Sequence, residues 1–318
     1  MRTADAALEA GFLLEFLTFA VSLVALYYGA KSITDSAVHF AKVLGVSEFV
    51  IGATVVAFGT ALPEFSTSLV AMLVDGGRPE IAAGNALGSI LANTGIALGA
   101  AAMFYGIYID RKILETDLSF LLASMLAVYV VFLDFKISWI EGIFLIAIYL
   151  SFIRHEISEH KKSESRGSET FLPKYLALFL AGIAMLSVGA SYMIEAIRAI
   201  STTLGLSEAV VAVILLAVGT SLPEISTAIV AAKNGRGDIA MGDVLGANTF
   251  NALIILGASS LVQDVVVNEA FVSVTLPVVV LISLLLGFMV MGNKITRFEG
   301  SMLVAIYFLE IITILTIL

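Results

Sequence analysis

Runs of apolar residues, each long enough to cross a lipid bilayer, recur along almost the whole chain. Hydrophobic residues make up 59% of the 318 residues and charged residues only 14%, whereas soluble proteins carry about 25% charged residues. A hydrocarbon core of about 30 Å needs about 20 apolar residues per helical crossing, so the sequence predicts an all-α integral membrane protein. We expect ten transmembrane helices, at residues 12–30, 49–74, 80–104, 118–133, 137–153, 172–197, 207–232, 239–262, 270–291 and 298–317.

One long hydrophilic stretch, "RHEISEHKKSESRGSETFLPK" at 154–174, falls between the fifth and sixth segments. It divides the chain into a first five-helix repeat at 1–155, a linker at 156–171 and a second five-helix repeat at 172–318. Lysine and arginine accumulate in cytoplasmic loops, and placing both termini outside puts 13 of the 17 basic residues inside. We therefore predict extracellular termini in a cell membrane and a cytoplasmic 154–174 loop.

Composition excludes several classes of function. The chain has no cysteine, which removes disulfides and thiolate metal sites. Its net charge of -9 argues against a nucleic acid partner, since phosphates are neutralised by basic patches. The apolar segments hold neither a Ser/His pair nor two aspartates, so an intramembrane protease, and an enzyme in general, is not expected. Neither a prosthetic group nor an obligatory protein partner is indicated.

A motif in the second segment has a twin in the seventh. The stretch "LGVSEFVIGATVVAFGTALPEFSTSLVA" (44–71) aligns without gaps with "LGLSEAVVAVILLAVGTSLPEISTAIVA" (204–231), with 15 of 28 positions identical. A second pair, "IAAGNALGSILANTGIALGA" (81–100) and "IAMGDVLGANTFNALIILGA" (239–258), follows at a slightly smaller offset. Because each half has an odd number of crossings, the two copies must be inverted in the membrane. Such repeats place a substrate site near the bilayer midplane, at discontinuous helices.

Each motif contains a proline that opens its helix. Pro63 has no N–H, and its ring clashes with the carbonyl of Gly59, so we expect the carbonyls of 57–60 to lose their helical partners. Pro223 predicts the same for the carbonyls near Ala217 and Thr220. At this depth, freed carbonyls are tolerated only beside protein or a polar cavity. They are therefore predicted cation ligands.

Beside each proline stands a glutamate, Glu64 or Glu224, at mid-depth. Two carboxylates close together in a low dielectric need a divalent cation, several monovalent cations or protons. Ca²⁺ takes six to eight oxygen ligands, and the motifs supply only oxygens. The candidates are the two glutamates, the opened carbonyls and the polar side chains at Thr60, Thr220, Ser221, Ser89, Asn93 and Asn251.

The paired motifs "GTALPE" with "GNALGSILAN", and "GTSLPE" with "GDVLGANTFN", closely resemble the two alpha repeats of the cation/calcium exchanger superfamily, above all its prokaryotic sodium/calcium exchangers. The resemblance implies a Ca²⁺/Na⁺ antiporter with alternating access, in which the first and sixth helices slide across the other eight. It makes Glu64 and Glu224 the calcium carboxylates. It assigns further ion contacts to the carbonyls of Thr60 and Thr220, to the carbonyls of Ala57 and Ala217 beside Na⁺, and to Ser89, Ser221, Asn93 and Asn251.

Two positions depart from that family pattern. Ala61 and Ala247 stand where many relatives have serine, so each half lacks one hydroxyl ligand. This leaves an H⁺/Ca²⁺ antiporter at the same site as the alternative to Na⁺/Ca²⁺ exchange. A channel is disfavoured because two facing broken helices suit an occluded site better than a continuous pore.

Other polar or small residues have plainer interpretations. The spacings Gly84-x-x-x-Gly88, Gly95-x-x-x-Gly99 and Gly242-x-x-x-Gly246 are typical of close helix contacts. Asn85 and Asp243 are interpreted either as helix caps or as part of a vestibule, and both readings stay open. The three histidines, His39, His155 and His160, are expected to be solvated near cytoplasmic connections.

Overall fold

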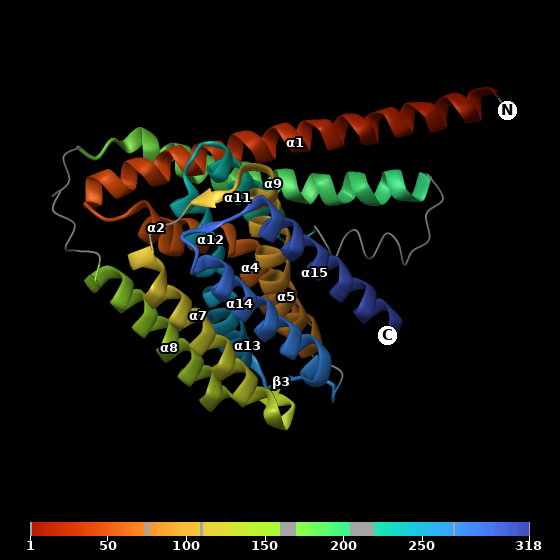
Figure 1. Cartoon of the computed structure of the whole chain (residues 1–318). Helices are drawn as coiled ribbons and strands as arrows, with labels where there is room; N and C mark the ends of the chain where they lie inside the picture. The colour runs from red at the N-terminus through yellow and green to blue at the C-terminus, as the bar shows by residue number, and fades with distance from the viewer. Residues whose placement is uncertain are drawn as a thin grey trace.

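The computed structural model describes residues 2–73, 77–108, 111–159, 170–203, 219, 221–269 and 271–317. Helices dominate it, and the four strands are two residues each (Figure 1). Helices lie on nine of the ten predicted segments, and α11 (Leu222–Lys233) occupies the last part of the remaining one. By length and apolarity, five helices in the described part of the chain qualify as membrane spans, or six if one bent pair is counted. The number of ten crossings therefore stays a prediction.

The two longest helices, α1 (Arg2–Leu44) and α9 (Pro173–Thr203), run side by side along one face of the molecule (Figure 1). The predicted end of the first segment at residue 30 is wrong, because the helix continues through the polar residues that follow. It stops at Gly45, whose φ of +67° suits glycine, and Val46 N–H closes the end on the carbonyl of Ala41 at 3.1 Å.

This longer helix also corrects the expectation for His39. The side chain is only 5% exposed. Its Nε2 accepts a hydrogen bond from the backbone N–H of Leu172 at 3.3 Å, and its ring stacks on Tyr175 with centroids 4.0 Å apart. His39 is therefore part of the packing between α1 and the start of α9 and is not solvated; His160 lies outside the described residues.

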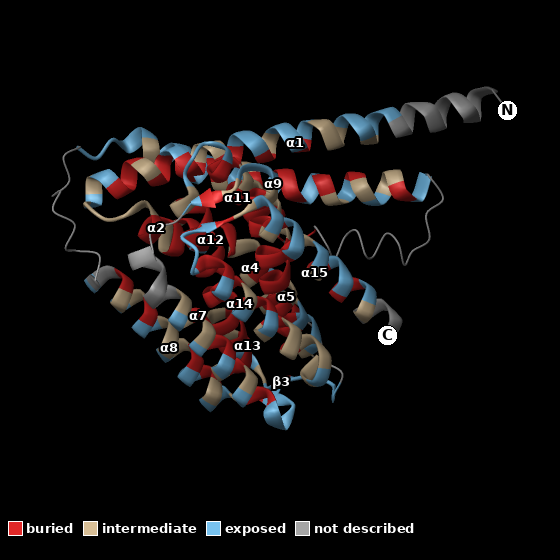
Figure 2. Cartoon of the chain, viewed as in Figure 1, coloured by how far each residue is buried: buried red, intermediate tan, exposed pale blue. Residues whose placement is uncertain are grey.

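Two interrupted helices form the centre of the molecule. The first comprises α5 (Pro79–Ala92), the π-helical turn η2 (Asn93–Leu98) and α6 (Gly99–Tyr105); the second comprises α12 (Gly237–Phe250), η5 (Asn251–Ile255) and α13 (Leu256–Val262). Of their most apolar 18 residues, 72% and 94% are buried, against 22% in α1 and 33% in α9. Figure 2 shows this buried centre and the exposed outer surfaces that would face lipid.

The outer helices are related in pairs. They are α7 (Arg111–Val131) with the short 3₁₀ turn η3 (Phe132–Asp134), α8 (Trp139–Glu159), the π turn η6 (Phe271–Thr275) with α14 (Leu276–Val290), and α15 (Arg297–Ile317). α15 packs on α6, and α8 packs on α13. Each half of the chain therefore supports the central helix of the other half.

Two short strand pairs show the symmetry that relates the halves. β1 (Ile107–Tyr108) pairs with β4 (Lys294–Ile295), and β2 (Lys136–Ile137) pairs with β3 (Val265–Val266), both antiparallel. Adding 158 to the residue numbers of β1 and β2 gives β3 and β4, so the pair Ile107–Ile295 is equivalent to Val265–Ile137. Because α7 separates β1 from β2 by 21 helical residues, the two strand pairs lie at opposite ends of the bundle. The copies are inverted, as predicted.

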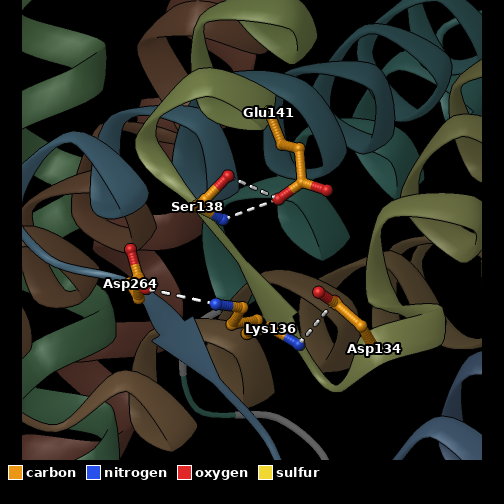
Figure 3. Close-up of polar contacts among 5 residues, drawn as sticks. All are labelled: Asp134, Lys136, Ser138, Glu141 and Asp264. Carbon is orange, nitrogen blue, oxygen red and sulfur yellow. Dashed lines mark hydrogen bonds and ion pairs between the residues drawn. The ribbon is translucent and has the colours of Figure 1, made fainter.

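The starts of α8 and α15 repeat the same cap. Ser138 donates its N–H and hydroxyl to Glu141 Oε2 at 2.8 and 2.7 Å, as Figure 3 shows. Thr296 makes the equivalent bonds to Glu299 Oε2, both at 2.7 Å. Such reciprocal caps fix the entry of the chain into a helix. Beside the first cap, Lys136 lies 3.9 Å from Asp264 of the neighbouring connection (Figure 3).

The predicted glycine contacts are confirmed for the second and third spacings, but the prediction for Gly84 and Gly88 is wrong, because a Cβ added at either glycine would meet nothing within 4 Å. A Cβ on Gly300 would lie 2.6 Å from the carbonyl oxygen of Gly99, and one on Gly257 would lie 2.9 Å from that of its partner Gly142. A Cβ on Gly242 would lie 2.4 Å from the carbonyl oxygen of Phe49. Glycine thus allows backbone contact at the crossings that hold the central helices.

Candidate ion-binding site

The first motif breaks its helix where the sequence predicts. α2 (Glu48–Ile51), the π turn η1 (Gly52–Val56) and α3 (Ala57–Thr60) lead into α4 (Leu62–Leu73), and the two parts are bent by 44°. The break is at Ala61, with φ -81° and ψ 1°. Pro63, two residues later, cannot donate a backbone hydrogen bond, which explains why the helix restarts here.

The second motif breaks at the equivalent residue. Ser221 has φ -92° and ψ 14°, and α11 begins at the next residue with Pro223 in its first turn. Phe65 N–H bonds the carbonyl of Ala61 at 3.0 Å, and Ile225 N–H bonds that of Ser221 at 2.9 Å. The two helix restarts are therefore the same structure made twice. The predicted ligands Thr220 and Ala217 lie outside the described residues.

Each restart presents one glutamate in its first turn. Glu64 and Glu224 are both 0% exposed, and none of their four carboxylate oxygens has a hydrogen-bond partner among the described residues. The charge of Glu64 interacts with the charges of Glu224 and Asp243, so the three groups share one region. Buried charges without partners are costly, and several like charges together require a cation or protons.

Asp243 is the residue that the sequence analysis left undecided, and the structure places it in the site. It is 0% exposed, and its Oδ1 accepts a hydrogen bond from the hydroxyl of Thr60 at 3.1 Å, while Oδ2 has no partner. It lies in the middle of α12, so it is not a helix cap. The usable signal was its position in the repeat, because Asp243 and Asn85 are equivalent at the 158-residue offset.

One expectation about the backbone needs correction. The carbonyl of Ala57 was predicted to lose its partners, but it accepts the N–H of Ala61 at 3.0 Å and lies 3.3 Å from the Thr60 hydroxyl. The helix opens one residue later than predicted, because the hydrogen bond from the Ala61 N–H to the Ala57 carbonyl is kept. An ion at Ala57 would have to share this carbonyl.

Amide side chains complete the buried polar surface. Asn93 and Asn251 are both 0% exposed and stand at the first positions of the π turns η2 and η5. In the part of the chain that the structure describes, neither amide has a hydrogen-bond partner, and neither does the hydroxyl of Ser221. Ser89 is also buried, at 1% exposed. π turns inside helices are often found at functional sites.

A second set of amides joins the helices around the site. Asn85 donates both of its amide hydrogens, to the Glu64 carbonyl and to the Ser68 hydroxyl, each at 2.9 Å. Asn248 donates to the Thr94 hydroxyl at 2.8 Å and so connects α12 to η2. For Asn85 the sequence left open a helix cap or part of a vestibule, and its position in the middle of α5 shows that it is not a cap. Asn248 was not singled out, because nothing in the sequence distinguishes a positioning amide from one that faces an ion.

The ligands that this site can offer to a cation are oxygen atoms. Within the described part of the chain, no three His, Cys, Asp or Glu side chains converge closely enough to hold a metal by themselves. A cation here would need hydroxyl, amide and carbonyl oxygens in addition to carboxylates. That combination is preferred by Ca²⁺ and other hard cations, and it is unlike a zinc or copper site.

Comparison with known proteins identifies the chain. The profile of the sodium/calcium exchanger protein family matches residues 14–157 and again residues 174–316. The chain belongs to the sodium/calcium exchanger family. Each match covers one half, so the profile itself reports the duplication. The family consists of transporters, which agrees with the expectation that the chain is not an enzyme.

Relatives in this family match over nearly their full length. The sodium/calcium exchanger MaX1 of Methanosarcina acetivorans is 30% identical over 92% of this chain and 96% of its own. An uncharacterized membrane protein of Methanocaldococcus jannaschii is 31% identical over 92% and 95%. Among solved structures, the sodium-calcium exchanger NCX_Mj superposes with a TM-score of 0.82 at 31% identity, covering 95% of this chain and 99% of that one. The arrangement of helices is therefore the exchanger fold.

Proposed function

We propose that the chain is a secondary active antiporter that exchanges Ca²⁺ for Na⁺ across a membrane. The observation that carries the proposal is the pair Glu64 and Glu224. Both are fully buried, both lie in the first turn of equivalent helix restarts, and none of their four oxygens has a partner among the described residues. Membership in the exchanger family and the similarity to MaX1 and NCX_Mj support the same choice of ions.

In this proposal, the two glutamates bind Ca²⁺ and Asp243 adds a third carboxyl group. Ca²⁺ carries two positive charges, so a site with three carboxylates needs one further positive charge, supplied by Na⁺ or by a proton. Thr60 and Thr220 contribute carbonyls, and those of Ala57 and Ala217 contact Na⁺. The remaining oxygens come from the hydroxyl and amide side chains at Ser89, Ser221, Asn93 and Asn251.

Transport would proceed by alternating access. Over their most apolar 18 residues, α1 and α9 are only 22% and 33% buried, against 72% and 94% in the two central helices, and they pack along each other. Helices with so little surface against the rest of the protein can slide as a pair while the central helices stay fixed. We place the protein in the cell membrane with both termini outside, and we propose that it needs neither a prosthetic group nor a protein partner.

The test is a flux assay in proteoliposomes. Vesicles loaded with Na⁺ and diluted into Na⁺-free medium should accumulate ⁴⁵Ca²⁺, and collapsing the Na⁺ gradient with a Na⁺ ionophore should stop the uptake. Vesicles loaded with K⁺ or Li⁺ are the controls. Uptake that is independent of the Na⁺ gradient would remove the proposed coupling.

H⁺/Ca²⁺ exchange at the same site is the second candidate. It is favoured by Ala61 and Ala247, both 0% exposed, which put methyl groups where a hydroxyl could bind Na⁺. It is also favoured by Asp243, since a third carboxyl group can carry a proton. Calcium uptake driven by a pH gradient in Na⁺-free vesicles would establish this alternative and replace the first proposal.

A further inference from the structure

A basic cavity lies between α1, α9 and the turn that joins α11 to α12. Its volume is ≈ 440 Å³. None of the residues that line it belongs to the ion site. They are Thr34, Asp35, Val38, Lys174, Tyr175, Leu178, Asn234 and Arg236.

The basic side chains of this cavity remain available to bind an anion. Asp35 is paired with Lys31 at 2.6 Å, so the carboxylate of the cavity is already neutralised. Arg236 contacts Glu48 through Nη1 at 2.7 Å, but a guanidinium has five N–H donors. Lys174 lies over the Tyr175 ring at 4.9 Å, and no described carboxylate is within ion-pair distance of it. The lining therefore carries two cations, Lys174 and Arg236, and one carboxylate, Asp35, in a chain whose net charge is -9.

The cavity also has an apolar side. Val38 and Leu178 line it together with the basic residues, and α9 continues from it with Leu176 and Leu180 exposed at 44% and 57%. α9 begins at Pro173, so the positive end of its helix dipole adds to the charge of Lys174. A ligand that fits must carry an anionic group next to apolar chains.

We propose that this cavity binds the phosphate group of an anionic phospholipid, with Lys174 and Arg236 as the contacts. Basic pockets between membrane helices on the cytoplasmic side bind such head groups, and the distribution of lysine and arginine predicts that this end is cytoplasmic. The head group would lie in the cavity at this end of the α1–α9 pair, with the acyl chains along the exposed leucines of α9. This lipid site does not depend on which ions are transported, so the test of the lipid site and the test of the proposed function can fail separately.

The test is native mass spectrometry of the purified full chain in detergent, titrated with phosphatidylglycerol or with phosphatidylcholine of the same chain length. Phosphatidylglycerol should bind with a defined stoichiometry and phosphatidylcholine should not. Each basic residue near the membrane surface contributes about five-fold in affinity, so Lys174→Gln combined with Arg236→Gln should weaken binding by about 25-fold. The matched control is Lys294→Gln, a lysine that also lies over a tyrosine ring, Tyr108, at 5.6 Å but outside the cavity.

Three outcomes would overturn the proposal. They are equal binding of the two lipids, equal binding by the double variant and the wild type, and an equal loss in the Lys294 control. Inorganic phosphate is added in a separate titration. If phosphate displaces phosphatidylglycerol at a similar concentration, the site binds a free anion and not a lipid. Arg236 also pairs with Glu48, so Lys174→Gln alone is measured as well, and it should lose about five-fold with an unchanged melting temperature.

Discussion

Asn85 and Asp243 occupy equivalent positions in the two halves of the chain, but their side chains have different roles. Asn85 donates two hydrogen bonds, to the Glu64 carbonyl and the Ser68 hydroxyl, and so holds the broken helix of its own half. Asp243 accepts one hydrogen bond from Thr60, which belongs to the opposite half, and keeps one oxygen without a partner. One copy is a positioning group, and the other is, in the proposed function, a group that faces the ion.

This difference shows how a duplicated fold makes an unsymmetrical site. The backbone symmetry is close, since both helix breaks, both strand pairs and both helix caps are repeated. The charge is unequal, because only the second half supplies a third carboxyl group. An exchanger that must bind ions of different charge at one place has a use for such an imbalance.

The largest expected effect comes from removing one charge of the symmetric pair. We expect Glu64→Gln and Glu224→Gln each to reduce Na⁺-dependent ⁴⁵Ca²⁺ uptake at least about 100-fold, since a charge lost within about 4 Å of an ion costs several kcal/mol. Both proteins should still elute as monodisperse peaks from size exclusion. Near-normal exchange by either variant would remove the central claim, and unequal losses would show that the asymmetry extends to the glutamates.

The next effect comes from making the first half resemble the second. Asn85→Asp replaces two donated hydrogen bonds with an acceptor-only carboxylate beside the Glu64 carbonyl. We expect a loss of about 1 to 3 kcal/mol in stability, the cost of leaving buried polar groups without partners, and lower exchange in consequence. Thermal melting of the purified protein measures this loss of stability. A melting temperature equal to that of the wild type would mean that the amide does not hold the helix.

The converse change should be milder. Asp243→Asn removes the third carboxyl group and leaves Glu64 and Glu224, whose charge of -2 matches Ca²⁺. We expect exchange within about three-fold of wild type, because a hydrogen bond with a charged partner contributes only about 1.5 to 3 kcal/mol and the amide keeps part of it. The dependence of uptake on pH should become flatter, because one proton-binding group is gone. Uptake measured between pH 6 and 9 tests this, and a loss as complete as that of Glu64→Gln would make Asp243 a calcium ligand equal to the glutamates.

The sequence predicted those features that have a local chemical cause. Pro63 and Pro223 are sufficient to place the helix breaks, and the matched motifs are sufficient to infer the inversion and the family. The burial of both glutamates followed from their position in apolar segments. None of these predictions required knowledge of how the helices cross.

Features that depend on packing between distant segments were missed or misplaced. The contact between Thr60 and Asp243 joins residues 183 positions apart, and the sequence gives no reason to prefer it to a cap at Asp243. His39 looked solvated because the helix was ended too early, at a run of polar residues that α1 in fact includes. The carbonyl of Ala57 was predicted to be free because a proline indicates that the helix breaks nearby but does not indicate which backbone hydrogen bonds survive the break.

A shift in Na⁺ dependence without a loss of transport is expected at Ala61 and its counterpart Ser221, the one position in the helix breaks where the halves differ by a single hydroxyl. Ala61 is 0% exposed and lies at the break itself, so Ala61→Ser would add an oxygen to a site that selects cations by oxygen count. If the counter-ion is Na⁺, this variant should reach half-maximal exchange at a Na⁺ concentration about three- to five-fold lower, the effect of one hydrogen-bond-sized contact of about 0.5 to 1 kcal/mol. Ser221→Ala is the matched control and should shift the same curve in the opposite direction. If protons are the counter-ion, neither change moves a Na⁺ curve, and both instead leave pH-driven uptake unaltered, because a carboxyl group and not a hydroxyl then carries the coupling ion. The pair of variants therefore decides between the two candidate functions at the position where the two halves of the helix breaks differ in chemistry.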